Sequence, residues 1–166
     1  MRKTIIGVMG PGERAHEEDI RNAYALGRLI AQEGWVLLTG GRNSGVMDAA
    51  NRGAKEADGL TIGILPTRDR TMISAAVDIP ILTEMGSARN NINVLTSDLI
   101  IACGMGTGTA SEVALALKAG KPVILITKDE EAKRFFLHLR PEKVFVAQDP
   151  AAALKQAVQL LSYSKR

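Results

Sequence analysis

The chain has 166 residues, of which 46% are hydrophobic, and a formal net charge of +3 at pH 7; this predicts a single domain over residues 1–166. Only 4% of the residues are aromatic, which argues against nucleic-acid binding by base stacking, and no apolar run is long enough to span a membrane. One cysteine and two distant histidines form neither a disulfide nor a metal-ligand set, so we expect a cytoplasmic protein without a metal site.

The first half of the chain alternates apolar runs with helical patterns. Strands are predicted at 4–9, 35–38 and 60–65, and helices from about Ile20 to Gly34 and roughly from Val46 to Lys55. Glycine-rich turns at 10–12 and 39–45 follow the first two strands. Residues 67–78 show no clear period, and we interpret them as a loop that covers the site and forms part of its walls.

The second half continues the alternation. Strands are predicted at 79–82, 98–102, 123–126 and 144–147, and helices from a Ser87 cap to about Leu95, after the turn at 103–112, at about 130–137 and at about 150–162. Pro80 places its strand at an edge or a strand end. Continuous apolar strands separated by helices predict an α/β, doubly wound, mostly parallel sheet with helices on both faces.

The glycine-rich turns carry the strongest functional signal. Ligands of such sheets bind at the carboxyl ends of the strands, where glycines let backbone N–H groups approach an anion at a helix N-terminus. The turn at 104–108 echoes the one at 40–45, which suggests two facing half-sites. We predict that the turns hold a small anionic, phosphorylated ligand, with binding residues Gly10, Gly12, Gly40, Gly41, Arg42, Asn43, Ser44, Gly45, Gly104, Met105, Gly106, Thr107, Gly108 and Thr109.

Two further residues each have two interpretations. Glu112 either closes a capping box with Thr109 as the helix cap or faces the ligand as a base or charge stabiliser. Arg89, in the first turn of its helix, either forms a surface salt bridge or grips an anion, because a cation there opposes the helix dipole. Arg42 is either a solvated loop residue or a phosphate ligand, and helix capping suffices to explain Asn43 and Ser44.

These residues resemble the Rossmann-like family that was long mislabelled "lysine decarboxylase" and includes the cytokinin-activating phosphoribohydrolases, the Lonely guy proteins. That family carries an arginine followed at a fixed interval by Pro-Gly-Gly-x-Gly-Thr-x-x-Glu. Arg89 takes the place of the arginine and Glu112 that of the glutamate, and Gly106, Gly108 and Thr109 match between them. The resemblance covers about residues 4–127 and implies a Rossmann-like fold.

Departures from the motif point to one branch of that family. Gly104 replaces the motif's proline, Met105 the glycine that follows it, and Asn90 the usual lysine. The sequence at residues 87–91 and 116–123 looks closer to the branch that includes the molybdenum cofactor carrier proteins. This resemblance implies a homo-oligomer, either a dimer or a tetramer built from dimers.

Two functions therefore remain open. In the first, the protein binds molybdenum cofactor, a phosphorylated pyranopterin, and protects it as cargo, with molybdenum enzymes or cofactor-synthesis proteins as partners and with neither nucleic acid nor membrane. In the alternative, it is a nucleoside 5′-monophosphate phosphoribohydrolase with Glu112 and Arg89 as catalytic residues. We favour the carrier, a protein that is not an enzyme, because the motif is altered around the glutamate.

Overall fold

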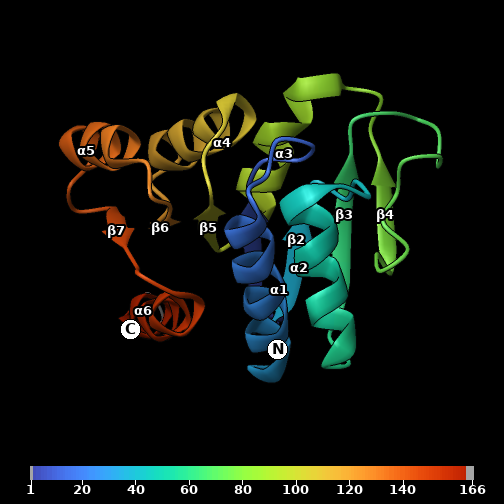
Figure 1. Cartoon of the computed structure of the whole chain (residues 1–166), viewed down its shortest axis with the longest axis horizontal. Coiled ribbons are helices and arrows are strands. Elements are labelled where there is room, and N and C mark those ends of the chain that lie inside the picture. The colour runs from blue at the N-terminus through green and yellow to red at the C-terminus, as the bar shows by residue number, and fades with distance from the viewer. Residues whose placement is uncertain (1, 164–166) are drawn as a thin grey trace.

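The computed structural model describes residues 2–163, so residues 1 and 164–166 of the expected domain lie outside the described part. All strand pairs are parallel, in one seven-stranded sheet of order β4-β3-β2-β1-β5-β6-β7 (Figure 1). The strands are β1 (Ile5–Met9), β2 (Val36–Thr39), β3 (Thr61–Leu65), β4 (Ile79–Leu82), β5 (Leu99–Cys103), β6 (Val123–Ile126) and β7 (Val144–Val146). The helices are α1 (Glu17–Gln32), α2 (Gly45–Glu56), α3 (Arg89–Thr96), α4 (Thr107–Lys118), α5 (Glu130–Leu139) and α6 (Pro150–Tyr163), with a short 3₁₀ turn at Gly86–Ala88.

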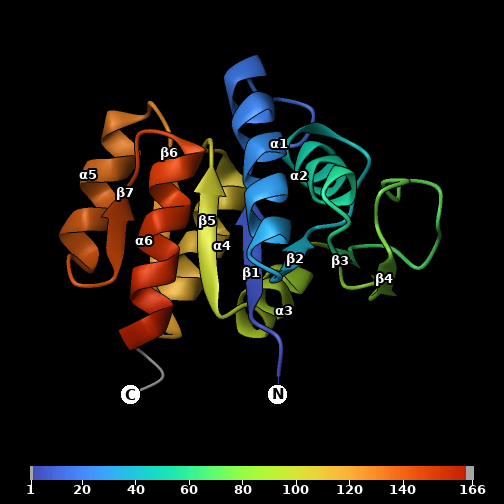
Figure 2. The same ribbon diagram turned by 90° about the horizontal axis from the view of Figure 1, so that it is seen from below.

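Helices cover both faces of the sheet, which confirms the predicted α/β doubly wound fold (Figure 2). Alternate residues of β5 point to opposite faces. Ile101 joins the core beneath α1, α2 and α6, whereas Ile100 joins the core beneath α3, α4 and α5. The central strands are therefore apolar along their whole length because each face buries one half of their side chains.

Helices α1 and α2 approach each other closely because glycines stand at their contact. A Cβ added at Gly27 would come within 2.0 Å of the Ala50 carbonyl oxygen, and one at Gly53 within 2.0 Å of the Tyr24 carbonyl oxygen. The turns that precede the two helices, at 10–12 and 40–45, are consequently held side by side, with the Val46 amide donating to the Pro11 carbonyl at 3.0 Å.

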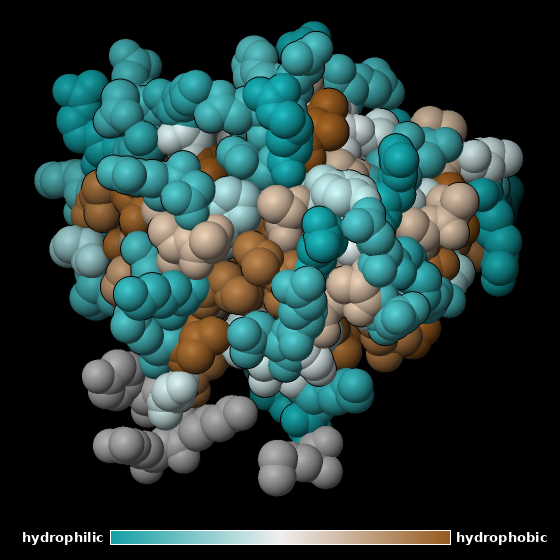
Figure 3. Space-filling view, turned by 60° about the horizontal axis from the view of Figure 1, so that its bottom comes forward, coloured by the Kyte–Doolittle hydropathy of each residue, from teal (hydrophilic) through white to brown (hydrophobic). Residues whose placement is uncertain are grey.

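The face that carries α1 and α6 is mostly polar. Figure 3 shows a narrow band of hydrophobic side chains in the middle of this face, bordered by hydrophilic ones. Ile20 of α1 and Val158 of α6 are the large hydrophobic residues of these two helices that are exposed. Within residues 2–163, no helix combines the length and hydropathy that crossing a membrane would require.

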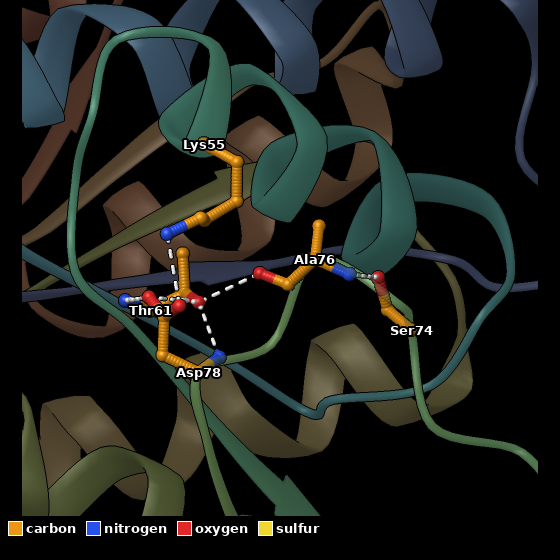
Figure 4. Close-up of polar contacts among 5 residues, drawn as sticks. All are labelled: Lys55, Thr61, Ser74, Ala76 and Asp78. Carbon is orange, nitrogen blue, oxygen red and sulfur yellow. Dashed lines mark hydrogen bonds and ion pairs between the residues drawn. The ribbon is translucent and has the colours of Figure 1, made fainter.

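The expectation that residues 67–78 cover the site is wrong, because none of them lines the cavity at the carboxyl ends of the central strands. This loop packs on the outer side of the turn at 40–45, where the Ser74 amide donates to the Gly41 carbonyl at 2.9 Å. Its end is anchored at the base of the sheet, because the Asp78 carboxylate accepts from Lys55 Nζ at 2.8 Å and from the Thr61 amide at 2.9 Å (Figure 4). The Thr61 hydroxyl in turn donates to the Ala76 carbonyl at 2.7 Å. These bonds hold the loop away from the carboxyl ends of β1 and β5.

Candidate functional site

A cavity of about 570 Å³ lies at the carboxyl ends of the central strands, next to the point where the strand order reverses between β1 and β5. It is lined by residues of the turns after β1, β2 and β5 and by side chains from α3 and α4. The lining residues predicted from the sequence are Gly10, Gly12, Gly40, Arg42, Arg89, Met105, Gly106, Thr107, Gly108, Thr109 and Glu112. The prediction that the three glycine-rich turns share one edge of the sheet is thus confirmed.

The N-terminus of α4 opens directly into this cavity. Gly106 is the N-cap residue and has no side chain to satisfy the first amides of the helix, and Thr107 and Gly108 line the cavity beside it. The Thr109 hydroxyl is buried and has no hydrogen-bond partner among the described residues. Free amides and a free hydroxyl at the positive end of a helix are the arrangement that binds an anion.

The capping-box interpretation of Glu112 is wrong because α4 begins at Thr107 and Thr109 already lies inside the helix. The Glu112 carboxylate instead lines the cavity and accepts a hydrogen bond from Asn93 Nδ2 of α3 at 2.8 Å. Burial raises the pKa of Glu112 to about 7, although the Asn93 bond and the charge of Arg89 act in the opposite direction. Near neutral pH this carboxyl therefore exchanges readily between its neutral and charged forms.

Arg89 is a partly buried cation, and it has no anionic partner within residues 2–163. It begins α3, where the N-cap is Ala88 rather than the expected Ser87. Its Nε is buried without a hydrogen-bond partner, and no carboxylate among residues 2–163 lies within 4.0 Å of its guanidinium. The surface-salt-bridge interpretation is therefore wrong. Burial lowers the pKa of Arg89, Glu112 opposes that shift and Arg42 adds to it.

The absence of a side chain at Gly40 leaves room for the Arg89 guanidinium. A Cβ built on Gly40 would lie 2.4 Å from Arg89 Nη1, so any larger residue would push the cation out of its position over the turn. A partly desolvated guanidinium that bonds to no residue in the described chain is suited to grip a phosphate through two parallel hydrogen bonds.

Arg42 is a second cation of the cavity, and its Nη2 lies 3.4 Å from Glu13 Oε1. The sequence interpretation missed Glu13 and Arg14, which follow Gly12 in the first turn and also line the cavity. It also missed Asn90, whose Nδ2 donates to the Ser111 hydroxyl at 2.9 Å. Glu13 and Arg14 could have been predicted from their position, because they directly follow a glycine-rich turn that was already assigned to the ligand.

Five predicted binding residues do not line the cavity and shape its turns instead. Gly41, Gly45 and Gly104 have φ values of 74°, 53° and 77°, which a residue with a Cβ rarely adopts. Ser44 is the N-cap of α2, as expected, but its side chain makes no capping bond and its hydroxyl is buried without a partner within the described chain. Asn43 is exposed, and its amide donates to the Met72 carbonyl at 2.9 Å.

Comparison with solved structures finds close neighbours over nearly the whole chain. The molybdenum cofactor binding protein from the phototrophic bacterium Rippkaea orientalis is 58% identical, with a TM-score of 0.96 over 97% of this chain and 99% of that chain. The Moco carrier protein from Chlamydomonas reinhardtii is 55% identical, with a TM-score of 0.92 over 98% of this chain and 99% of that chain.

A more distant relative is the cytokinin riboside 5′-monophosphate phosphoribohydrolase of Mycobacterium tuberculosis. It is 29% identical over 119 residues, which cover 67% of this chain and 64% of the relative. These relationships agree with the resemblance drawn from Arg89, Glu112 and the glycines between them. The chain matches the SLOG cluster4 family (LDcluster4) over residues 3–154 and belongs to that family.

Proposed function

We propose that the protein binds molybdenum cofactor and carries it as protected cargo. One observation supports this most directly: the Nε of Arg89 and the hydroxyl of Thr109 are both buried without partners in the described chain, beside the open N-terminus of α4. The neighbours that are 58% and 55% identical bear names that state molybdenum cofactor binding or carriage.

The residues of the cavity fit the phosphate of this cargo. The first amides of α4 and the Thr109 hydroxyl supply donors on one side, and Arg89 supplies a charged fork on the other. Arg42 adds a second positive charge from the turn after β2. A carrier needs only binding and shelter from solvent, and the proposed role assigns no chemical step to these groups.

Glu112 is compatible with an anionic cargo in its neutral form. Because burial raises its pKa to about 7, a bound phosphate favours the protonated carboxyl, which does not repel it. Affinity for the cargo should accordingly fall as the pH rises through about 7, and a Glu112→Gln variant should lose this dependence.

Cofactor uptake tests the proposal. Purified protein is incubated with molybdenum cofactor, freed of excess ligand, and assayed for retained molybdenum and for its ability to activate a cofactor-free molybdenum enzyme. We expect Arg89→Ala to lose retention by about ten-fold or more, since a charge-assisted hydrogen-bond pair contributes ~1.5–3 kcal/mol. Arg52→Ala, an exposed arginine of α2 outside the cavity, is the matched control. Failure of the unaltered protein to retain cofactor would contradict the proposal.

The phosphoribohydrolase function is the second candidate, because Glu112 is a buried carboxyl in the cavity with a pKa of about 7, suited to general acid–base work. The test is release of free base from AMP and related monophosphates. Turnover that disappears in Glu112→Gln, together with no retention of molybdenum cofactor, would favour the enzyme over the carrier.

Homo-oligomer formation and delivery to molybdenum enzymes or cofactor-synthesis proteins follow from the family resemblance and stay predictions. Light scattering coupled to size exclusion measures the first: a mass of two or four times 17.8 kDa is expected. A pull-down with a purified cofactor-free molybdenum enzyme measures the second.

A further inference from the structure

A second cavity adjoins the candidate site. Its volume is about 620 Å³, and it lies beyond the carboxyl ends of β6 and β7, against the first turns of α1. Both cavities fall within the roughly 300–1,000 Å³ range of small-molecule sites. Met105 lines both of them and no other described residue does, so a single side chain forms their shared wall.

The charges of the second cavity are largely paired within the protein. Lys128 Nζ lies 2.5 Å from Glu18 Oε2, and Lys133 Nζ lies 2.6 Å from Glu130 Oε1. The Asp129 carboxylate accepts the Ala132 amide at 2.9 Å as the cap of α5. These pairs leave little positive charge for a second anion.

The groups left to meet a ligand are one carboxylate and two amides. Asp19 Oδ2 accepts one long bond from the His16 amide at 3.3 Å, and Asp19 Oδ1 has no hydrogen-bond partner among residues 2–163. Asn22, one turn further along α1, and Gln148, after β7, line the cavity with side-chain amides that pair with no described residue. This set matches a neutral heterocycle whose edge carries N–H donors and a carbonyl acceptor, and the carboxylate disfavours a phosphate.

The loop between β5 and α4 brings Asp19 close to the shared wall. A Cβ added at Gly104 would lie 2.6 Å from Asp19 Oδ2, so the carboxylate packs directly on the residue before Met105. Met105 itself is partly exposed, and a thioether side chain is flexible enough to move aside and makes favourable contacts with ring edges.

We propose that the second cavity is the subsite for the pterin ring of the cargo, with Asp19 and Asn22 reading its aminopyrimidinone edge and Met105 contacting the ring. The phosphate of the same molecule occupies the first cavity. This inference rests on the proposed function and deepens it by dividing the site into an anion compartment and a ring compartment. Asp19 pairs with the ring N–H and the exocyclic amino group as a two-fold acceptor.

Binding of two probes separates the compartments. The probes are 6-hydroxymethylpterin phosphate, followed by its own fluorescence, and inorganic phosphate, followed by calorimetry. In the unaltered protein the ester should bind more tightly than inorganic phosphate. Asp19→Asn and Asn22→Leu should each weaken the ester by about ten-fold or more, as the loss of a charge-assisted or buried hydrogen bond does, and leave inorganic phosphate within about two-fold.

Controls make the outcome decisive. Glu17→Gln changes a carboxylate of the same helix that lines neither cavity, and it should alter neither probe. Asn22→Leu tests the same subsite without changing Asp19, which bonds to the His16 amide at the start of α1. Circular dichroism verifies that both variants fold. The subsite is overturned if both variants bind the ester like Glu17→Gln, or if both probes weaken together. The proposed function fails on a different result, namely ester binding that Arg89→Ala does not change.

Discussion

Glu112 is the one acidic or basic residue that is buried within residues 2–163, at 7% exposure. It receives a single hydrogen bond from Asn93, whose own Oδ1 is buried without a partner in the described chain. Arg89 lies near enough to influence it electrostatically but beyond ion-pair distance. Two opposite charges are thus held apart in one cavity, and each keeps bonding capacity that the protein does not use.

Glu112→Gln should remove a pH dependence of stability. The folded pKa of Glu112 is raised from 4.5 to about 7, so its stabilising contribution is complete below about 4.5 and is lost as the pH rises through about 7. We expect the variant to be more stable than the unaltered protein at about pH 8 by up to ~3 kcal/mol, and not at about pH 4. Urea unfolding at both pH values measures this, and equal differences at the two values would contradict it.

At the scale of single elements, the start of α4 matters most for the site. No side chain caps the first amides of this helix, since its N-cap is Gly106. The second residue of the helix, Gly108, would have no atom within 4 Å of an added Cβ. Glycine costs helix stability relative to alanine. The helix therefore gives up stability at the end that lines the cavity, where small residues leave room for an anion.

Gly108→Ala should separate stability from binding. We expect the free energy of unfolding to rise by ~0.5–1 kcal/mol, because alanine is the better helix former and meets no clash. Phosphate affinity should fall, because Gly108 lines the cavity and an added methyl group takes up space beside the anion. Gly120→Ala is the contrasting variant: the space around it is also open, but its φ of 72° makes alanine strained, so it should destabilise the protein. Similar effects of the two variants on stability would be the contradicting result.

The Asp78 anchor should matter for stability and not for binding. Partial burial acts to raise the pKa of Asp78, but hydrogen bonds from Lys55 and Thr61 dominate and hold it below 3.8. Its contribution is therefore present at neutral pH and lost only as the pH falls through that lowered value. Asp78→Ala should cost about 1–3 kcal/mol by stranding the Thr61 amide. Glu84→Ala, which breaks an exposed ion pair with Arg68, should cost little, and neither should change phosphate affinity.

At the scale of the whole molecule, the cavity is assembled from segments that are distant in the chain. Arg89 reaches over Gly40, and Asn93 of α3 holds Glu112 of α4. These contacts require the sheet to be complete, since β2, β1 and β5 carry the turns at its edge. Ligand binding and global folding are consequently linked.

Inorganic phosphate should therefore raise the unfolding temperature of the protein. A ligand that binds only the folded state stabilises it by ~2.7 kcal/mol at about 100 times its Kd. Differential scanning fluorimetry with and without phosphate measures the shift. We expect the shift in Arg52→Ala and little of it in Arg89→Ala; an equal shift in both variants would place the anion elsewhere on the molecule.

Local sequence patterns sufficed for the secondary structure, because continuous apolar strands and helical spacing depend on near neighbours in the chain. They also sufficed to bring the three glycine-rich turns to one edge, because parallel strands align their carboxyl ends. Tertiary structure alone decided that Glu112 bonds to Asn93, that Arg89 Nε has no partner within residues 2–163 and that residues 67–78 do not line the cavity. Those outcomes depend on distances between separate elements, which the spacing of residues along one strand or helix does not determine. Burial in the assembled structure then shifts the pKa of Glu112 and of Arg89.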